Sequence, residues 1–515
     1  MTQINRIIVV GGGTAGWLTA GLLAATHCKP DAEGNALSVT VVESSTVHPI
    51  GVGEGTWPTM RRTLAKIGLS ETDLVKQASA TFKQASKFVN WHTNNVGNTY
   101  YHPFSAPQGS ASLDVSPYWL SDCERRGQYA SDVCFQPAIC DAGLAPKISA
   151  QAGKSFVANY GYHLDAGQFI DLLRSHCTEK LGVKHIVDDV ISVNQNVEGI
   201  SSLQTRENGE LCADLYVDCS GFSALLIEKA LNIELTDASQ YLFADRALVC
   251  QLPYEDSTKP IACYTKSTAQ EAGWIWDIEL QARRGTGYVY SSQHQSTESA
   301  SNTLANYLNQ YTNNALDTSD FKEIRFKTGY RKKFWDKNCV AIGLSSGFLE
   351  PLEASSLMLI EQSAQLLSEQ LPSDTSVMKL VERRFNKQVR GMWESAIDFL
   401  KLHYVLSNNN TAFWSDNRQT STIPDKLENL LKEWRLRPVL ESDFTQTSDI
   451  FSAQSYRYIL YGMLDKTADG VAASANERML KDREFADKQF SLNQALVKQL
   501  QTRLPSHRGL IESFS

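Results

Sequence analysis

Three glycines near the N-terminus are spaced to hold a phosphate-containing cofactor. Residues 11–16 read Gly-Gly-Gly-Thr-Ala-Gly, after an apolar segment and before an expected helix. Gly11 permits a tight turn, Gly13 lets the backbone approach a pyrophosphate, and Gly16 lets the helix pack closely on the strand. The amino end of such a helix faces the phosphates. The spacing predicts that this chain binds a dinucleotide.

The flanking sequence predicts the strand–helix–strand unit that such a turn needs. The first strand covers residues 7–10, the helix about 17–25, and the second strand 39–42, which ends at Glu43. Glu43 lies 27 positions after Gly16 (43 − 16), against the usual spacing of about 20. We expect its carboxylate to accept hydrogen bonds from ribose hydroxyls.

Later segments favour FAD over NAD as the dinucleotide. Residues 213–218 form a strand that runs into Gly221, and residues 339–343 form a buried strand. The run 348–353 leads into a helix that begins near Ser355 or Ser356, and its amino end would stabilise the negative charge of a reduced isoalloxazine. Residues 343–356 are therefore predicted to form a wall of the flavin site. We see no second dinucleotide fingerprint for NAD(P)H.

Two further groups of side chains stand out. Lys83 lies among Thr81, Phe82 and Phe88, an unusually apolar setting for a lysine. Trp274 and Trp276 are two positions apart in an expected strand, so both indoles point to the same face. The ordinary alternatives are a solvated surface lysine and a pair of tryptophans that fill a sheet core.

Composition indicates a globular protein of more than one lobe. A chain of 515 residues exceeds the size at which one hydrophobic core keeps growing. Its net charge of −8 argues against nucleic acid as a partner, because phosphate binding draws on clustered lysine and arginine. The apolar run 7–10 is too short to cross a membrane and lacks a signal-peptide cleavage pattern.

Ten scattered cysteines form no Cys-x-x-Cys pair. This usage is typical of reduced thiols in a cytoplasmic protein, and it favours neither a disulfide framework nor a metal site.

The motifs together resemble the flavin-dependent tryptophan halogenase family. Residues 51–56 match its Gly-x-Gly-Glu-x-Thr segment, Phe82-Lys83 its Phe-Lys pair, residues 274–278 its Trp-x-Trp-x-Ile run, and residues 350–353 its Glu-Pro-Leu-Glu run. The resemblance extends from Gly11 to about Gly462. Glu279 stands where the family has proline, and Ala354 and Ser355 replace its serine and threonine.

The resemblance implies a reaction and the residues that serve it. Reduced FAD (FADH2), dioxygen and chloride or bromide would give hypohalous acid, which Lys83 would deliver to an electron-rich aromatic ring. Glu353 would hold this arrangement and take the ring proton as a general base. Backbone N–H groups of Ser355 and Ser356 would bind the halide, and Trp274 and Trp276 would keep substrate away from the flavin.

The resemblance also implies the binding residues. The expected cofactor contacts are Gly11, Gly13, Thr14, Ala15, Gly16, Glu43, Gly51, Gly343 and Leu352. His102 and Phe104 would clamp the substrate, and Tyr456 occupies the place of a pocket tryptophan. The acid and tyrosines that would grip free tryptophan are not evident upstream of Tyr456. An indole derivative, a phenol or an aromatic residue in a peptide therefore stays open as the substrate.

The expected fold class is α/β, a Rossmann-like three-layer flavoprotein fold with a β-sheet substrate lobe and a helical C-terminal part. The FAD lobe would comprise residues 1–85, 160–230 and 320–370, the substrate lobe 86–159 and 231–319, and the helical part 371–515. Helices are expected within 355–404 and 471–503 from apolar positions three to four residues apart.

Three functions remain open from the sequence. The first is a two-component halogenase that receives FADH2 from a separate flavin reductase, and a homodimer is plausible from the family. The second is an FAD-dependent aromatic monooxygenase. The third is a non-catalytic binding module that keeps a flavoprotein fold. Lys83, Glu353 and the paired tryptophans favour the first.

Overall fold

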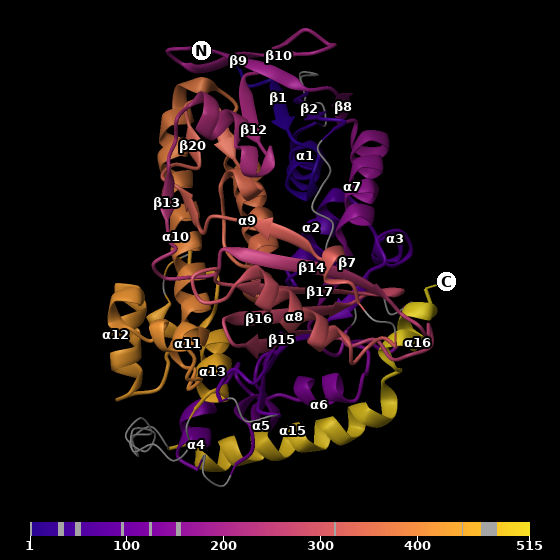
Figure 1. The fold of residues 1–515 in the computed structure, drawn as a ribbon, viewed down its shortest axis with the longest axis vertical. Coiled ribbons are helices and arrows are strands. Elements are labelled where there is room, and N and C mark those ends of the chain that lie inside the picture. Colours follow the sequence, from indigo (N-terminus) through magenta and orange to yellow (C-terminus); the bar gives the residue numbers. More distant parts are fainter. Residues whose placement is uncertain are drawn as a thin grey trace. The chain divides into compact units, whose positions relative to one another are not determined.

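The computed structural model describes residues 3–28, 36–46, 53–93, 97–122, 126–150, 156–313, 316–444, 446, 448–464 and 481–514. The chain forms two compact units, each assembled from three segments (Figure 1). The first unit comprises Met1–Ala80, Leu164–Ala238 and Lys327–Glu394. The second comprises Thr81–His163, Ser239–Phe326 and Ser395–Ser515.

The first unit is built on a largely parallel sheet. Its strand order is β20-β21-β12-β1-β2-β8, and only the β20–β21 pairing is antiparallel. The strands are β1 (Arg6–Val10), β2 (Ser38–Glu43), β8 (Lys184–Val187), β12 (Leu215–Asp218), β20 (Trp335–Asp336) and β21 (Cys339–Ala341). The strands expected near residues 7–10, 39–43, 213–218 and 339–343 are confirmed.

A second sheet covers one face of this sheet. Ile8 and Val10 of β1 pack in one core cluster with Ile200 and Leu203, which belong to a three-stranded sheet of β9 (Val190–Asn196), β10 (Gly199–Thr205) and β11 (Glu210–Leu211). Side chains alternate along a strand, so Ile7 and Val9 face the opposite side. The α/β class predicted from the sequence is confirmed.

Helix α1 (Thr14–His27) is buried along most of its length, including Trp17, Leu18 and Leu22. A helix that is apolar on all sides must be covered by other elements. Helices α2 (Met60–Ile67), α7 (Ala166–Leu181) and α9 (Ser355–Gln370) contact it. The predicted helices after residue 16 and near Ser355 are thus confirmed. The first unit also contains α3 (Glu71–Gln77), β3 (Gly53–Gly55), β13 (Leu235–Asp237), β19 (Gly329–Arg331) and β22 (Gly347–Phe348).

The second unit is built on a seven-stranded sheet with the order β18-β14-β17-β16-β15-β5-β6. Its pairings are antiparallel except β15–β5. The strands are β5 (Ala85–Val89), β6 (Thr99–Pro103), β14 (Arg246–Pro253), β15 (Tyr264–Gln270), β16 (Gly273–Glu279), β17 (Arg283–Tyr290) and β18 (Lys322–Arg325). Trp274 and Trp276 therefore lie in a strand, as predicted.

The two faces of this sheet have different neighbours. Ile275 of β16 packs in a cluster with Leu304 and Leu308 of α8 (Thr297–Leu308). Trp274 points to the other face, where its ring lies 6.2 Å from that of Trp91. This alternation puts the indoles on the side away from α8.

Helices dominate the C-terminal part, as the sequence predicts. They are α10 (Met378–Val405), α11 (Ala412–Asp416), α12 (Asp425–Trp434), α13 (Ala453–Gly462), α15 (Arg483–Arg503) and α16 (His507–Glu512). The predicted helical pattern over 471–503 is confirmed from Arg483 onward, and residues 471–480 lie outside the described part. Shorter elements of the second unit are β4 (Thr81–Lys83), α4 (Ser116–Leu120), α5 (Tyr129–Val133) and α6 (Gln136–Asp141), while β7 (Gly161–Asp165) spans the boundary between the units.

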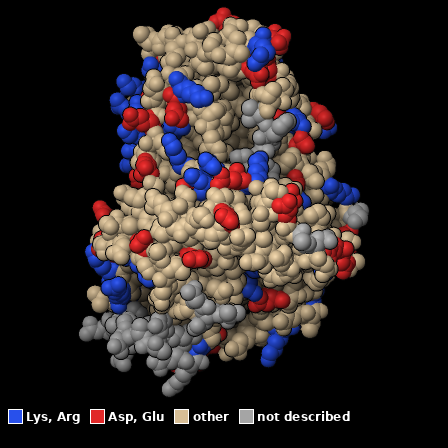
Figure 2. Space-filling view, viewed as in Figure 1, with Lys and Arg blue, Asp and Glu red and all other residues tan. Residues whose placement is uncertain are grey.

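The surface carries charges of both signs. On the face shown in Figure 2, lysines and arginines are interspersed with acids among larger uncharged areas. No described helix combines the length and the apolar character that a membrane crossing requires. The cysteines in the described part are free thiols, and most of them are buried.

Candidate active site

The glycine turn of the first unit has one closed side and one open side. Gly11 has φ +119°, and a Cβ at this position would lie 2.1 Å from the carbonyl oxygen of Cys219. A Cβ on Gly16 would lie 1.9 Å from the carbonyl oxygen of Gly11. By contrast, nothing lies within 4 Å of a Cβ on Gly13. Glycine is therefore needed where strand and helix pack, and the space beside Gly13 is open.

The first turn of α1 leaves its backbone donors available. Gly13 is the N-cap, no side chain caps the helix, and no acidic residue occurs in the first turn. N–H groups at a helix start, including those of Thr14 and Ala15, are suited to bind an anionic phosphate. The turn therefore fits the pyrophosphate of a dinucleotide.

Glu43 lies at the end of β2 and packs against the turn. Its carboxylate is 3.0 Å from Nε2 of His185 and 3.8 Å from a guanidinium nitrogen of Arg174. A Cβ on Gly12 would lie 2.0 Å from Cδ of Glu43. Gly12 was not singled out from the sequence, because the side chain that demands it comes from another strand.

Gly343 approaches the same turn from β21. It has φ +83°, and a Cβ there would lie 2.6 Å from Cβ of Ala15. The structure thus brings Gly343 to the first turn of α1, where the sequence predicts flavin. Gly51, another predicted cofactor contact, lies outside the described residues.

The segment before α9 has an unusual backbone. Glu353 and Ala354 both have left-handed conformations, with φ of +59° and +55°. Both residues belong to the short 3₁₀ turn Leu352–Ala354. Such conformations cost about 1–2 kcal/mol for a non-glycine residue and occur often at functional sites. Nε1 of Trp57 donates to the Glu353 carbonyl oxygen at 2.7 Å, which helps to hold this turn.

The start of α9 fits a small anion. The helix has no side-chain cap, so neither serine makes the ordinary capping bond. The Oγ atom of Ser355 is buried and has no hydrogen-bond partner among the described residues. Oγ of Ser356 donates to the Leu349 carbonyl oxygen at 3.2 Å. A buried hydroxyl and the backbone donors of a sixteen-residue helix are together suited to a halide.

Glu54 gives a pH test of the first unit. Its Oε2 atom is shielded from solvent and has no hydrogen-bond partner among the described residues. Burial, with a smaller effect from the negative charge of Asp165, raises the pKa of Glu54 from 4.5 to about 7. The native carboxyl then holds its proton more tightly than the unfolded one, so the free energy of unfolding falls as the pH rises between these two values.

We expect this loss to reach up to about 3 kcal/mol above pH 7. Urea unfolding of the wild type and of Glu54→Gln at about pH 5 and pH 8 measures it. The glutamine variant, which cannot titrate, should lose less stability over this interval. Equal losses in the two proteins would contradict the raised pKa.

Lys83 is fully buried in the second unit. It ends β4, which pairs with β7 so that Lys83 lies opposite Gly161. Its Nζ atom lies 5.3 Å from the ring centre of Phe104, a cation–π distance. Burial, followed by the positive charge of Lys83, lowers the pKa of His163 well below its usual range. Lys83 is therefore not the solvated surface lysine of the ordinary alternative.

The paired indoles depend on a glycine in the neighbouring strand. Trp274 and Trp276 are both buried, and their ring centres lie 6.4 Å apart. Trp276 is opposite Gly287 in β17, where a Cβ would lie 2.1 Å from Cη2 of the indole. Gly287 thus provides the space that the indole occupies. Its importance was not predicted, because it depends on the pairing of β16 with β17.

The structure brings two of the three predicted substrate residues together. His102 lies 5.7 Å from the ring of Phe399, and Tyr456 lies 4.9 Å from the same ring. Phe399 itself was not predicted, because nothing in the helical pattern of α10 distinguishes it from other core residues. Phe104, the third, lies beside Lys83 instead. Lys83 belongs to the second unit, whereas Glu353 belongs to the first.

Known proteins resemble this chain over nearly its whole length. The model of the tryptophan halogenase family matches residues 6–477. The solved structure of a tryptophan halogenase from Shewanella frigidimarina NCIMB 400 is 43% identical, with a TM-score of 0.93, and the match covers 100% of this chain and 98% of that one.

Two other relatives differ in how they are named. Tryptophan 6-halogenase SttH of Streptomyces toxytricini is 32% identical over 98% of this chain and 97% of its own length. BrvH, a flavin-dependent halogenase from Brevundimonas sp. BAL3, is 31% identical, with a TM-score of 0.85 and coverage of 100% and 99%. The family uses a flavin and a halide and depends on a separate flavin reductase. The chain belongs to the tryptophan halogenase family and is a flavin-dependent halogenase.

Proposed function

We propose that this enzyme uses FADH2, dioxygen and chloride or bromide to halogenate an electron-rich, indole-type aromatic substrate through Lys83. The observation that carries the proposal is the complete burial of the Lys83 ammonium beside the ring of Phe104. An ion is costly to bury, and buried ionisable groups occur often at functional sites.

The glycine turn, Thr14, Ala15, Glu43 and Gly343 would hold the FAD, with Gly51 and Leu352 as further contacts. When bound, reduced flavin supplies hypohalous acid from dioxygen and halide. The open space at Gly13 and the close approach of Gly343 to Ala15 support this placement. The Ser355 hydroxyl, which has no hydrogen-bond partner in the described part of the chain, supports a halide site at the start of α9, formed by the N–H groups of Ser355 and Ser356.

Lys83 would direct the halogen to carbon. Its ammonium polarises hypohalous acid by a hydrogen bond, or it exchanges one N–H hydrogen for the halogen, which forms a haloamine and releases water. In the first case the ring carbon bonds to the halogen, the oxygen–halogen bond breaks, and the oxygen leaves as water with a proton from Lys83. Glu353 takes the proton that the ring carbon loses. The net change replaces one ring hydrogen by halogen; Glu353 then releases its proton to solvent, and Lys83 takes one up.

The substrate is proposed as an indole-type aromatic, free or within a peptide. Two of the relatives above are named for tryptophan, while BrvH, at nearly the same identity as SttH, is named only as a flavin-dependent halogenase. Buried aromatic rings around His102, Phe399 and Tyr456 support an aromatic substrate. Trp274 and Trp276 would separate it from the flavin.

A product-mass experiment tests the proposal. The enzyme is supplied with FAD, a flavin reductase, NADH, bromide and oxygen, and is screened against indole, tryptophan, a phenol and a tryptophan-containing peptide. We expect at least one brominated product. A product that gains one oxygen instead would indicate an aromatic monooxygenase. Flavin binding without either product would indicate a binding module.

A further inference from the structure

The strand that carries Lys83 has two edges, and they are held by different means. On one edge, β4 pairs with β7 through Thr81 opposite His163 and Lys83 opposite Gly161. In an antiparallel pair, alternate residues direct their backbone groups to the other edge. The N–H groups of Phe82 and Gln84, on either side of Lys83, therefore need other partners.

Both N–H groups are linked, one directly and one through a side chain, to the segment Ile261–Cys263, which precedes β15. The N–H of Gln84 donates directly to the Cys263 carbonyl oxygen at 2.7 Å. The N–H of Phe82 donates to Nε2 of His507 at 2.9 Å, and Nδ1 of the same ring lies 2.9 Å from the Ile261 carbonyl oxygen. The imidazole of His507 thus takes the place of a missing backbone bond between the two segments.

The partners of His507 fix its tautomer. An amide N–H can only donate and a carbonyl oxygen can only accept, so Nε2 is bare and Nδ1 carries the hydrogen. Burial lowers the pKa of His507 to about 4, partly offset by its bond to Ile261. The ring is neutral near pH 7, as this bridge requires.

Short-range contacts hold His507 in this orientation. Its own N–H donates to the Gly143 carbonyl oxygen at 2.8 Å, and Ala145 N–H donates to the Pro505 carbonyl oxygen at 3.0 Å. The ring of Phe514, just after α16, lies 6.1 Å from that of Phe82. The C-terminal helix is therefore tied to the residue next to Lys83 by a hydrogen bond and by ring packing.

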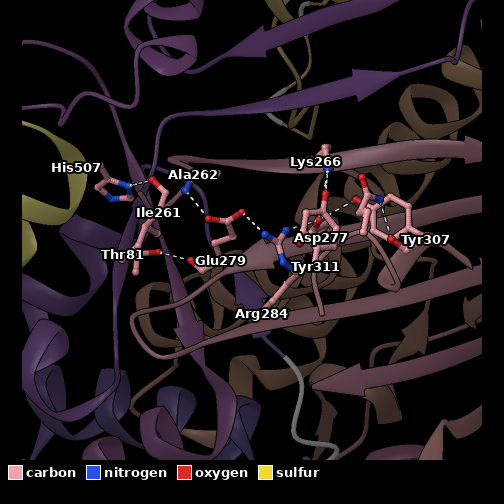
Figure 3. Close-up of polar contacts among 11 residues, drawn as sticks. Thr81, Ile261, Ala262, Lys266, Asp277, Glu279, Arg284, Tyr307, Tyr311 and His507 are labelled. Carbon is pink, nitrogen blue, oxygen red and sulfur yellow. Dashed lines mark hydrogen bonds and ion pairs between the residues drawn. The ribbon is translucent and has the colours of Figure 1, made fainter. Parts of the chain in front are cut away.

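Glu279 contacts the segment Ile261–Cys263, which lies along this second edge of β4 (Figure 3). Its Oε2 atom accepts the N–H of Ala262 at 2.7 Å, and its backbone carbonyl accepts the Thr81 hydroxyl at 2.9 Å. Nη2 of Arg284 lies 2.6 Å from Oε1, which completes the charge pairing of the carboxylate. Glu279 therefore contacts both β4 and the neighbouring segment Ile261–Cys263.

We propose that His507 and Glu279 are positioning residues for Lys83. The two side chains fix the edge of β4 that does not pair with β7, so that the ammonium stays where the halogen is transferred. The inference rests on the proposed function of Lys83. Neither side chain needs to touch the substrate. A displacement of about 1 Å at a reacting group can cost about 100-fold in rate, so a loosened β4 should impair transfer.

The test compares His507→Leu with His507→Gln. Leucine removes both hydrogen bonds, whereas the glutamine amide keeps a donor and an acceptor side by side. Arg508→Leu is the matched control, since Arg508 is the next residue of α16 and its Nε donates to the Lys259 carbonyl oxygen, away from β4. Each holoenzyme receives the reductase system, bromide and a substrate from the screen above.

The measured quantity is the ratio of brominated product to hypohalous acid released, which a scavenger traps. This ratio does not depend on how much of the protein is folded. We expect it to fall at least about 10-fold in His507→Leu, to recover largely in His507→Gln, and to stay near wild type in Arg508→Leu. Hydrogen exchange at the Phe82 amide should speed up in the leucine variant.

Two outcomes separate the inference from the proposed function. If Lys83→Ala keeps normal product formation, the role of Lys83 fails and the inference fails with it. If Lys83→Ala is inactive but His507→Leu keeps the wild-type ratio, only the inference is overturned. Should His507→Leu not fold, Glu279→Leu tests the same edge through Ala262, and an unchanged ratio there would overturn the inference equally.

Discussion

The variant Lys83→Ala should lose halogenation while it still binds FAD. The substitution removes the only group that we assign to halogen transfer, and such groups contribute about 10²–10⁴-fold to a rate. Product formation is measured by mass spectrometry with bromide and the best substrate. FAD affinity is measured by quenching of flavin fluorescence, and it should stay within about 2-fold because the glycine turn belongs to the first unit.

Lys87→Ala is the matched control for this experiment. Lys87 lies in β5, four positions after Lys83, and pairs with Asp141 at 2.7 Å with a side chain that is 18% exposed. Its loss should leave bromination within about 3-fold, as expected of a partly exposed ion pair. More than a tenth of the wild-type rate in Lys83→Ala would refute the role of the ammonium.

The second large effect is expected for Glu353→Gln. Glutamine keeps the shape of the side chain but cannot take a proton from the ring carbon, so turnover should fall about 100-fold or more. Release of hypohalous acid should continue, because the carboxylate is assigned to ring deprotonation. Steady-state bromination and scavenger-trapped oxidant, measured together, separate the two steps.

Glu361→Gln is a close control for Glu353→Gln. Glu361 is a buried glutamate of α9 that accepts hydrogen bonds from Thr59 and Thr63 at 2.9 and 2.6 Å. Glutamine can keep one of these acceptors, so this change should affect stability more than turnover. If both variants lose turnover equally, or if Glu353→Gln is as fast as wild type, Glu353 has no specific role in the reaction.

Local signals explain which parts of the fold were predictable. Contiguous residues predict the strand before Gly11, the helix after it and the strand that ends at Glu43. The observed elements β1, α1 and β2 agree with these predictions. The alternation around Trp274 likewise places a strand at β16. Each of these patterns is set by neighbours within a few positions.

Features that depend on distant residues were not predictable. Gly12 must be glycine because Glu43 packs on it, and Gly287 must be glycine because an indole occupies its space. The two left-handed residues before α9 have no local signature, since neither Glu353 nor Ala354 favours that conformation. The His507 bridge joins positions 82, 261 and 507, and no spacing rule connects them.

The contact between Glu279 and Arg284 has an evolutionary consequence. The two residues face each other across β16 and β17, and the arginine balances a carboxylate at a position where the family motif has proline. A proline there would leave the guanidinium with Asp277, at 2.5 Å, as its one ion-pair partner among the described residues. Among related chains, acid at the first position and arginine at the second should therefore be inherited as a pair and be lost together.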